Sequence, residues 1–181
     1  MVKDSNIYDS TEIKLIILFV LEKMEIPLNE NSLIDICYSR NGWINYMDCK
    51  ENLASLIDVG FIYKASGNDN EERYTITYEG RSCLSHFYYK IPEKLREQIT
   101  EFSKENRMHF KRSQEYVSDY FKNKDGSYIC IMKIKDVSVG DPIFEIKIKA
   151  PSRQAAIEAC KKWRDTAHIA FENIYEMYIV N

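Results

Sequence analysis

A thiol and an imidazole lie three residues apart in the segment Cys83-Leu84-Ser85-His86. Residues at this spacing share one face of a helix, so the pair could contribute two ligands to a metal ion. Structural zinc needs four ligands. The remaining cysteines and histidines form no second matching pair: Cys37, Cys49, Cys130, Cys160, His109 and His168. We therefore expect no metal site.

The sequence also lacks the patterns of common enzyme classes. It contains no Gly-x-Ser-x-Gly elbow, and its 6 glycines include no phosphate-binding loop. We expect neither an enzyme nor a bound cofactor. An odd cysteine count without a Cys-x-x-Cys pair and without a leader-like start predicts free thiols in the cytoplasm. The apolar run 15–21 is too short to cross a bilayer, so we expect no membrane segment.

Polar residues at the start of a predicted helix over about 46–59 could read DNA bases. The N-terminal residues of a recognition helix face base edges in the major groove. Asn45 and Asn52 could pair with adenine, and Lys50 could reach guanine or phosphate. With residues just before this helix and beside the strands that follow it, the candidate DNA-binding set is Arg40, Trp43, Asn45, Tyr46, Lys50, Asn52, Lys64 and Arg73.

The elements expected around these residues occur in the order of a winged helix. Helices are predicted over about 11–24, with Ser10 as N-cap, and over 30–39, capped by Asn29 or Asn31. Gly60 should end the third helix in a left-handed conformation. Two strands, 61–64 and 73–77, then flank a polar tip, and Thr77 should cap a fourth helix.

The second half predicts a different arrangement. Pro92 should open a helix that runs to about 115, and the sequence then alternates like strands over 116–121, 128–135 and 143–149. A final helix follows over about 152–178. We thus expect an α+β chain: a winged helix-turn-helix domain over 1–89, then a domain over 90–181 with a long helix, a three-stranded antiparallel sheet and a long C-terminal helix.

The last predicted helix is longer than such a sheet can cover. Its apolar residues recur at steps of four and three through Trp163, Ala167, Ala170, Ile174 and Met177. The part before Ala167 suits packing on the sheet of the same chain. Beyond it, packing on the first domain and packing on a second copy are both open, and we expect a homodimer through this helix.

Charge is unevenly distributed and favours no single partner. Residues 1–89 carry 8 Lys and Arg against 14 Asp and Glu, whereas residues 90–181 carry 17 against 14. Lysine and arginine contacts to phosphate supply most non-specific DNA affinity. The net negative charge of the predicted winged helix-turn-helix domain therefore conflicts with DNA binding. Two interpretations remain: basic residues elsewhere in a dimer contact DNA, or the domain is a protein-interaction or sensory adaptor that does not contact DNA.

The segment Tyr74-Thr75-Ile76-Thr77-Tyr78-Glu79-Gly80-Arg81-Ser82-Cys83-Leu84 resembles the Tyr-x-Leu-Thr-x-x-Gly-x-x-x-Leu signature at the wing of bacterial PadR- and MarR-type regulators. Nearly the whole chain also resembles an uncharacterised bacterial family that pairs a winged helix with a C-terminal α/β portion. The resemblance implies a transcriptional regulator and no more, and it includes no enzymatic motif. It implies no individual functional residues.

Overall fold

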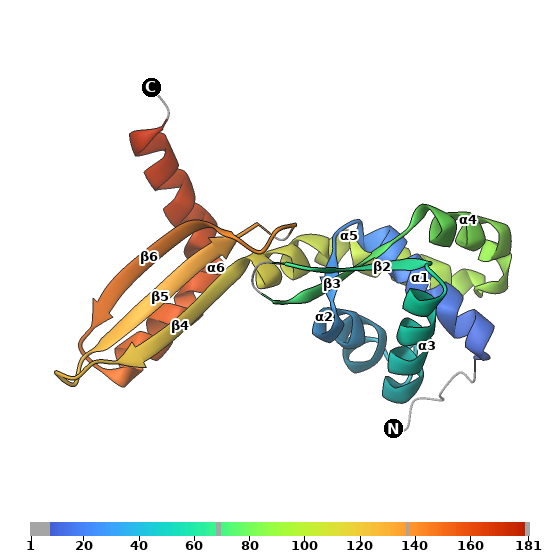
Figure 1. Ribbon diagram of the computed structural model, residues 1–181, viewed down its shortest axis with the longest axis horizontal. Coiled ribbons are helices and arrows are strands. Elements are labelled where there is room, and N and C mark those ends of the chain that lie inside the picture. Colours follow the sequence, from blue (N-terminus) through green and yellow to red (C-terminus); the bar gives the residue numbers. More distant parts are fainter. Residues whose placement is uncertain (1–7, 68–69, 137, 180–181) are drawn as a thin grey trace. The chain divides into compact units, whose positions relative to one another are not determined.

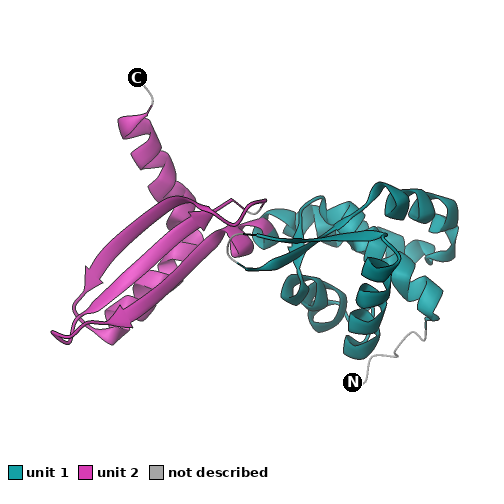
Figure 2. Ribbon diagram, in the orientation of Figure 1, with its two compact units in different colours: residues 1–110 teal, residues 111–181 magenta. Residues whose placement is uncertain are grey.

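A computed structural model describes residues 8–67, 70–136 and 138–179 of the protein. Asn68 and Asp69, in the predicted wing tip, lie outside the described residues. The chain forms two compact units, residues 1–110 and 111–181 (Figure 2). Both contain helices and a three-stranded antiparallel sheet, so the predicted α+β class is confirmed.

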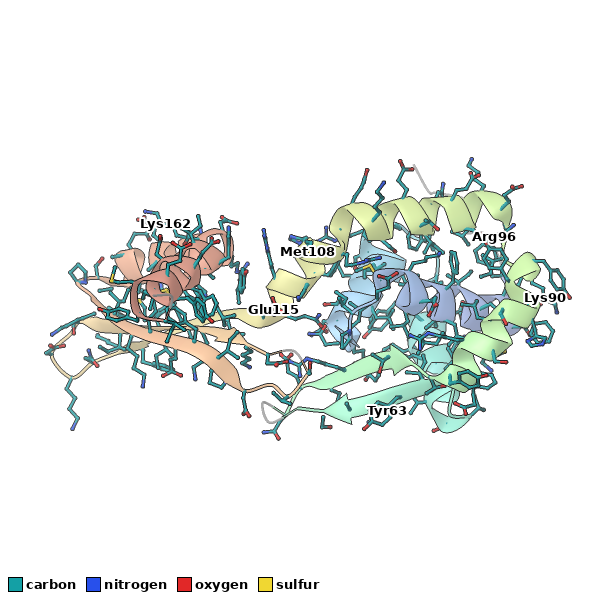
Figure 3. All side chains as sticks on the ribbon, turned by 90° about the horizontal axis from the view of Figure 1, so that it is seen from above. Tyr63, Lys90, Arg96, Met108, Glu115 and Lys162 are labelled. Atoms are coloured by element: carbon teal, nitrogen blue, oxygen red, sulfur yellow. The ribbon has the colours of Figure 1, made fainter. Side chains whose placement is uncertain are left out.

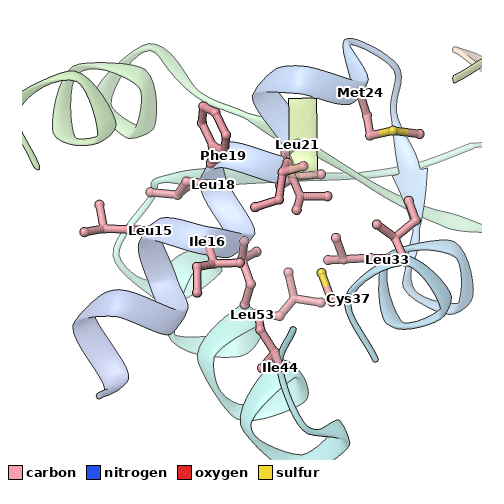
Figure 4. Packing of buried hydrophobic residues seen from close by; sticks show 14 of the residues in the cluster. Leu15, Ile16, Leu18, Phe19, Leu21, Met24, Leu33, Cys37, Ile44 and Leu53 are labelled. Carbon is pink, nitrogen blue, oxygen red and sulfur yellow. The ribbon is translucent and has the colours of Figure 1, made fainter. Parts of the chain in front are cut away.

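The first unit is built around helix α1, Ser10–Met24 (Figure 1). Its residues from Leu15 to Leu21 are all buried, because apolar side chains surround the helix on every side. The other helices pack against it, and Ile16, Leu33, Cys37, Ile44 and Leu53 meet in the core (Figure 4). The predicted cap of α1 was wrong by one residue: Asp9 is the N-cap, since its carboxylate accepts the Glu12 N–H at 2.8 Å.

The second helical segment is divided into two parts. Helix α2, Glu30–Ile34, starts at the predicted cap Asn29 and continues as a π-helical segment η1, Asp35–Arg40. Helix α3, Tyr46–Asp58, follows after a short turn. Wider turns of this kind are uncommon and cannot be read from apolar periodicity, which predicted a single helix here.

A small sheet completes the core of the first unit. Strands β2, Ile62–Ser66, and β3, Glu72–Ile76, pair antiparallel as the sequence predicted. Gly60 ends the preceding helix segment with a φ of +76°, also as predicted. The two-residue strand β1, Leu28–Asn29, pairs with β3 and was not predicted.

Two helices follow this sheet. Helix α4, Tyr78–Phe87, is capped by Thr77 as expected, and a 3-10 turn η2, Tyr88–Lys90, leads into helix α5, Glu93–Glu115. The division between the units falls at 110/111, inside α5, whereas the sequence suggested 89/90. Most of α5 belongs to the first unit because its apolar face lies in that core: Leu95, Ile99 and Phe110 are buried there.

The second unit is a sheet covered on one face by a helix. Strands β4, Tyr116–Lys122, β5, Tyr128–Lys135, and β6, Pro142–Ala150, form the predicted three-stranded antiparallel sheet, and their order is β4-β5-β6. Helix α6, Arg153–Tyr178, packs on this sheet. Its small residues Ala156 and Ala167 are fully buried, which lets the helix lie close to the strands.

Candidate nucleic-acid interface

The start of α3 presents a polar cap with its side chains exposed. Asn45 caps the helix: its side-chain oxygen accepts the Asp48 N–H at 2.8 Å, and its amide nitrogen donates to the Asp48 carboxylate. The helix dipole places partial positive charge here, which favours an anion. Asn45 therefore combines a structural role with a side chain that can reach solvent and a ligand.

Two exposed side chains follow Asn45. Tyr46 is 43% exposed and Met47 59% exposed. The Tyr46 ring meets Tyr38 of η1 edge to face, with 6.1 Å between centroids. Because neither Tyr46 nor Met47 is needed in the core, this corner is an exposed apolar and aromatic surface beside a polar cap.

Lys50 lies one turn further along α3. Its ammonium lies 5.8 Å from the centre of the Tyr46 ring and 3.2 Å from a carboxylate oxygen of Glu30 at the start of α2. Hydrogen bonding to Glu30 raises the pKa of Lys50, so the residue remains a cation over the physiological range. The ion pair links the first turn of α2 to the second turn of α3.

The other predicted cations are also paired with acids. Arg40 Nε lies 2.6 Å from Asp35, and Arg73 Nη2 lies 3.3 Å from Glu71. Lys64 Nζ donates to Glu72 at 2.8 Å across the β2–β3 ribbon, which lowers the pKa of that carboxyl. The Arg40 and Lys64 pairs are exposed and contribute roughly 0–1 kcal/mol, so a phosphate could replace the carboxylate at little cost. Arg73 is only 3% exposed, so its guanidinium does not face a ligand as the sequence predicted.

Three of the predicted residues are engaged inside the protein: Arg73, described above, Asn52 and Trp43. Asn52 is 7% exposed; its amide oxygen accepts the Ser10 hydroxyl at 2.7 Å, and its amide nitrogen donates to the Asp48 carbonyl at 2.8 Å. It thus joins α1 to α3 and does not face a base. Trp43 packs edge to face on Phe102 of α5, with centroids 5.7 Å apart.

Sequence reasoning missed exposed residues next to the candidates. Met47 and Tyr38 border Tyr46, and Tyr63 projects from β2 and is 61% exposed (Figure 3). Strand alternation could have found Tyr63, because its neighbour Ile62 is buried. Tyr38 could not be found in this way, since it lies on the π-helical segment and its direction differs from the α-helical expectation.

Other chemistry has little support within the described part of the chain. There, no group of three or more histidine, cysteine or acidic side chains is placed to hold a metal ion. His86 Nδ1 lies 2.7 Å from the Ser82 carbonyl oxygen of its own helix, and all five cysteines are free thiols. In the described residues, no helix combines the length and apolar character that a bilayer span requires.

Comparison with known proteins gives one match. A family model described as a domain of unknown function, DUF4364, matches residues 13–178, which covers both units. No curated protein and no solved structure matches the chain.

Proposed function

The chain therefore belongs to the DUF4364 family, and we propose that it is a DNA-binding transcriptional regulator of winged-helix type. The observation that supports this most is the sequence of elements in the first unit. Three helices precede an antiparallel β2–β3 ribbon, and the start of α3 is exposed while Cys49, Leu53 and Leu56 of the same helix are buried. In this proposal that order of elements is a winged helix, in keeping with the resemblance of segment 74–84 to the wing signature of PadR- and MarR-type regulators.

In this proposal α3 is the recognition helix. Asn45 is placed to hydrogen-bond adenine in the major groove, and Tyr46 and Met47 are placed to contact thymine methyl groups. Lys50, now paired with Glu30, turns to a guanine or a phosphate. The β2–β3 ribbon is the wing, and its Lys64 contacts the DNA backbone. The Lys64 ammonium there exchanges the Glu72 carboxylate for a phosphate oxygen.

We also propose that the regulator works as a homodimer in which the end of α6 contributes to the interface. Helix-turn-helix dimers bind two half-sites about one helical turn apart. The exposed apolar residues after Ala167 support self-association: Ile169, Ile174, Tyr175, Met177 and Tyr178 are each more than 40% exposed.

Binding to labelled genomic fragments, followed by polarisation across a salt series, tests the proposal. We expect affinity to fall steeply with salt because phosphate contacts release counterions. Tyr46→Ala and Lys50→Ala should weaken binding, whereas Lys94→Ala, an exposed lysine on α5, should not. The DNA proposal is abandoned if this protein binds every fragment at low salt no more tightly than a neutral control protein does.

One observation favours a second function, a protein-interaction or sensory adaptor. Each predicted DNA-contacting cation has a carboxylate partner, and the surface around Tyr46 carries exposed aromatic and apolar side chains. Such a surface suits a protein partner, and its binding should depend little on salt. A pull-down from nuclease-treated lysate separates the two: loss of all partners supports DNA, and a retained protein lost with Tyr46→Ala supports the adaptor.

A further inference from the structure

Strand β6 is an outer strand of the second unit's sheet. Strand β5 pairs along one edge, and no strand in the described part of the chain pairs with the other. A free edge presents unpaired backbone N–H and C=O groups, which readily accept another strand. At 9 residues, β6 is long for such an edge, and its single proline stands at the first position.

The side chains of β6 are self-complementary about Ile146. If two β6 strands pair antiparallel with Ile146 opposite Ile146, then Glu145 of each strand lies opposite Lys147 of the other. On the opposite face, Phe144 lies opposite Ile148. Opposite charges and apolar pairs directly across an antiparallel ladder both stabilise it. If one strand shifted by one residue along the other, side chains from different faces of the sheet would lie opposite each other. The charge pairs and the apolar pairs would then both be lost.

The helix-covered face of the sheet is incompletely covered at this edge. Ile148 remains 50% exposed, although its register neighbour Cys130 on β5 is fully buried under α6. Neighbouring strands would normally bury an isoleucine on this face. A second β6 placed alongside would put an apolar phenylalanine next to Ile148.

The C-terminal end of α6 leaves the sheet at the β6 edge. Phe171 packs edge to face on Phe144 of β6, with ring centroids 5.7 Å apart. Beyond that contact, α6 extends past the sheet on the side of β6 (Figure 1). There Ile174, Met177 and Tyr178 are 41%, 70% and 75% exposed.

We propose that a second copy of this chain docks along β6, so that the two sheets join into one six-stranded antiparallel sheet. The overhanging end of each α6 then covers apolar side chains of the partner. Stable interfaces bury roughly 800 Å² per partner, more than one strand edge offers, so the helix overhang is needed to complete the interface. This inference deepens the homodimer proposed above and does not depend on DNA binding.

Light scattering on the full chain without DNA tests it. The wild type should show a mass of about twice 21.4 kDa over the micromolar range. Lys147→Glu places two carboxylates opposite each other, and Glu145→Lys places two ammonium groups opposite each other. Each variant alone should dissociate at roughly tenfold higher concentration than the wild type, because two attractive pairs become repulsive.

Mixing the two variants should restore the dimer, since every cross-strand pair is again of opposite charge. That result cannot come from misfolding of either variant. Lys122→Glu on β4, the opposite edge of the sheet, makes the same charge change and should leave the dimer intact. A mass of one chain at all concentrations overturns the proposal. So does a dimer that is insensitive to both β6 variants and is lost only with Ile174→Asp, since that dimer would use α6 alone.

Discussion

Gly80 in the first turn of α4 lies directly against the backbone carbonyl of Phe61. A Cβ atom added at Gly80 would be 2.2 Å from the Phe61 oxygen and 2.9 Å from Cγ1 of Ile76. The same carbonyl accepts the Thr77 N–H at 3.0 Å, and the Thr77 hydroxyl donates to the Gly60 carbonyl at 2.8 Å. The Thr-x-x-Gly spacing thus joins the start of α4 to the segment that enters β2.

Gly80→Ala should destabilise the first unit. The methyl group cannot be accommodated without moving backbone, and overpacking of this kind costs about 1–3 kcal/mol. Denaturant unfolding of wild type and variant measures the difference. Ser85→Ala, at an exposed position of the same helix, should change the unfolding free energy by less than about 0.5 kcal/mol. Equal stability of Gly80→Ala and wild type would show that the two segments do not approach this closely.

Local signals were sufficient to predict most of the fold. The alternation predicted over 128–135 and 143–149 corresponds to the observed strands β5 and β6. Gly60 and Thr77 identified the end of one helix and the start of another. These residues act through backbone conformation and capping within a few positions, so their effects are visible in sequence alone.

Features that depend on distant residues were not predictable. Asn52 looked like a base-contacting residue at the exposed start of a helix, but the Ser10 hydroxyl 42 positions earlier holds it inside. Trp43 is held by Phe102 of α5. The strand β1 exists only because β3 pairs with it. Each case requires knowing which segments meet, and periodicity carries no such information.

Asn45→Ser should separate the capping role of this residue from a role in reading bases. Serine caps helices about as well as asparagine, so unfolding free energy should change by only a few tenths of a kcal/mol. The amide that pairs with adenine is lost, and affinity for the preferred fragment should fall by about 1–3 kcal/mol. Polarisation gives the affinity, and thermal unfolding gives the stability. Unchanged DNA affinity would remove Asn45 from the recognition surface.

Removing the acidic partners of the candidate cations should strengthen DNA binding. In the double variant Glu30→Gln and Glu72→Gln, Lys50 and Lys64 lose their carboxylates and are free for phosphate. The salt slope of binding should steepen by about one for each lysine that gains a phosphate contact. Stability should change little, because exposed ion pairs contribute roughly 0–1 kcal/mol.

The double variant Glu79→Gln and Glu97→Gln is the matched control for this experiment. It also removes two negative charges, from exposed positions on α4 and α5, and releases neither Lys50 nor Lys64. Any increase in affinity that it shares with the first double variant reflects net charge alone. If the first double variant binds no better than this control, the two lysines do not contact DNA, and the adaptor function is favoured.

Tyr74 should make the first unit sensitive to alkaline pH. Its side chain lies in β3, the residue is 5% exposed, and burial together with the charges of Glu72 and Glu30 raises its pKa to about 12. An unfolded tyrosine has a pKa near 10. The folded state therefore retains a proton that the unfolded state releases. The stabilisation is complete below pH 10 and is lost as pH rises from about 10 through 12.

The measurement compares wild type with Tyr74→Phe by denaturant unfolding at pH 8 and pH 11. At pH 8 the wild type should be the more stable, because the tyrosine hydroxyl bonds to Glu72 at 3.3 Å. Between the two pH values the wild type should lose about 1 kcal/mol more than the variant, which has no group to titrate at this position. Other tyrosines titrate equally in both proteins and cancel in the comparison. Parallel pH dependence of the two proteins would show that the Tyr74 hydroxyl is as accessible to water in the folded state as in the unfolded chain.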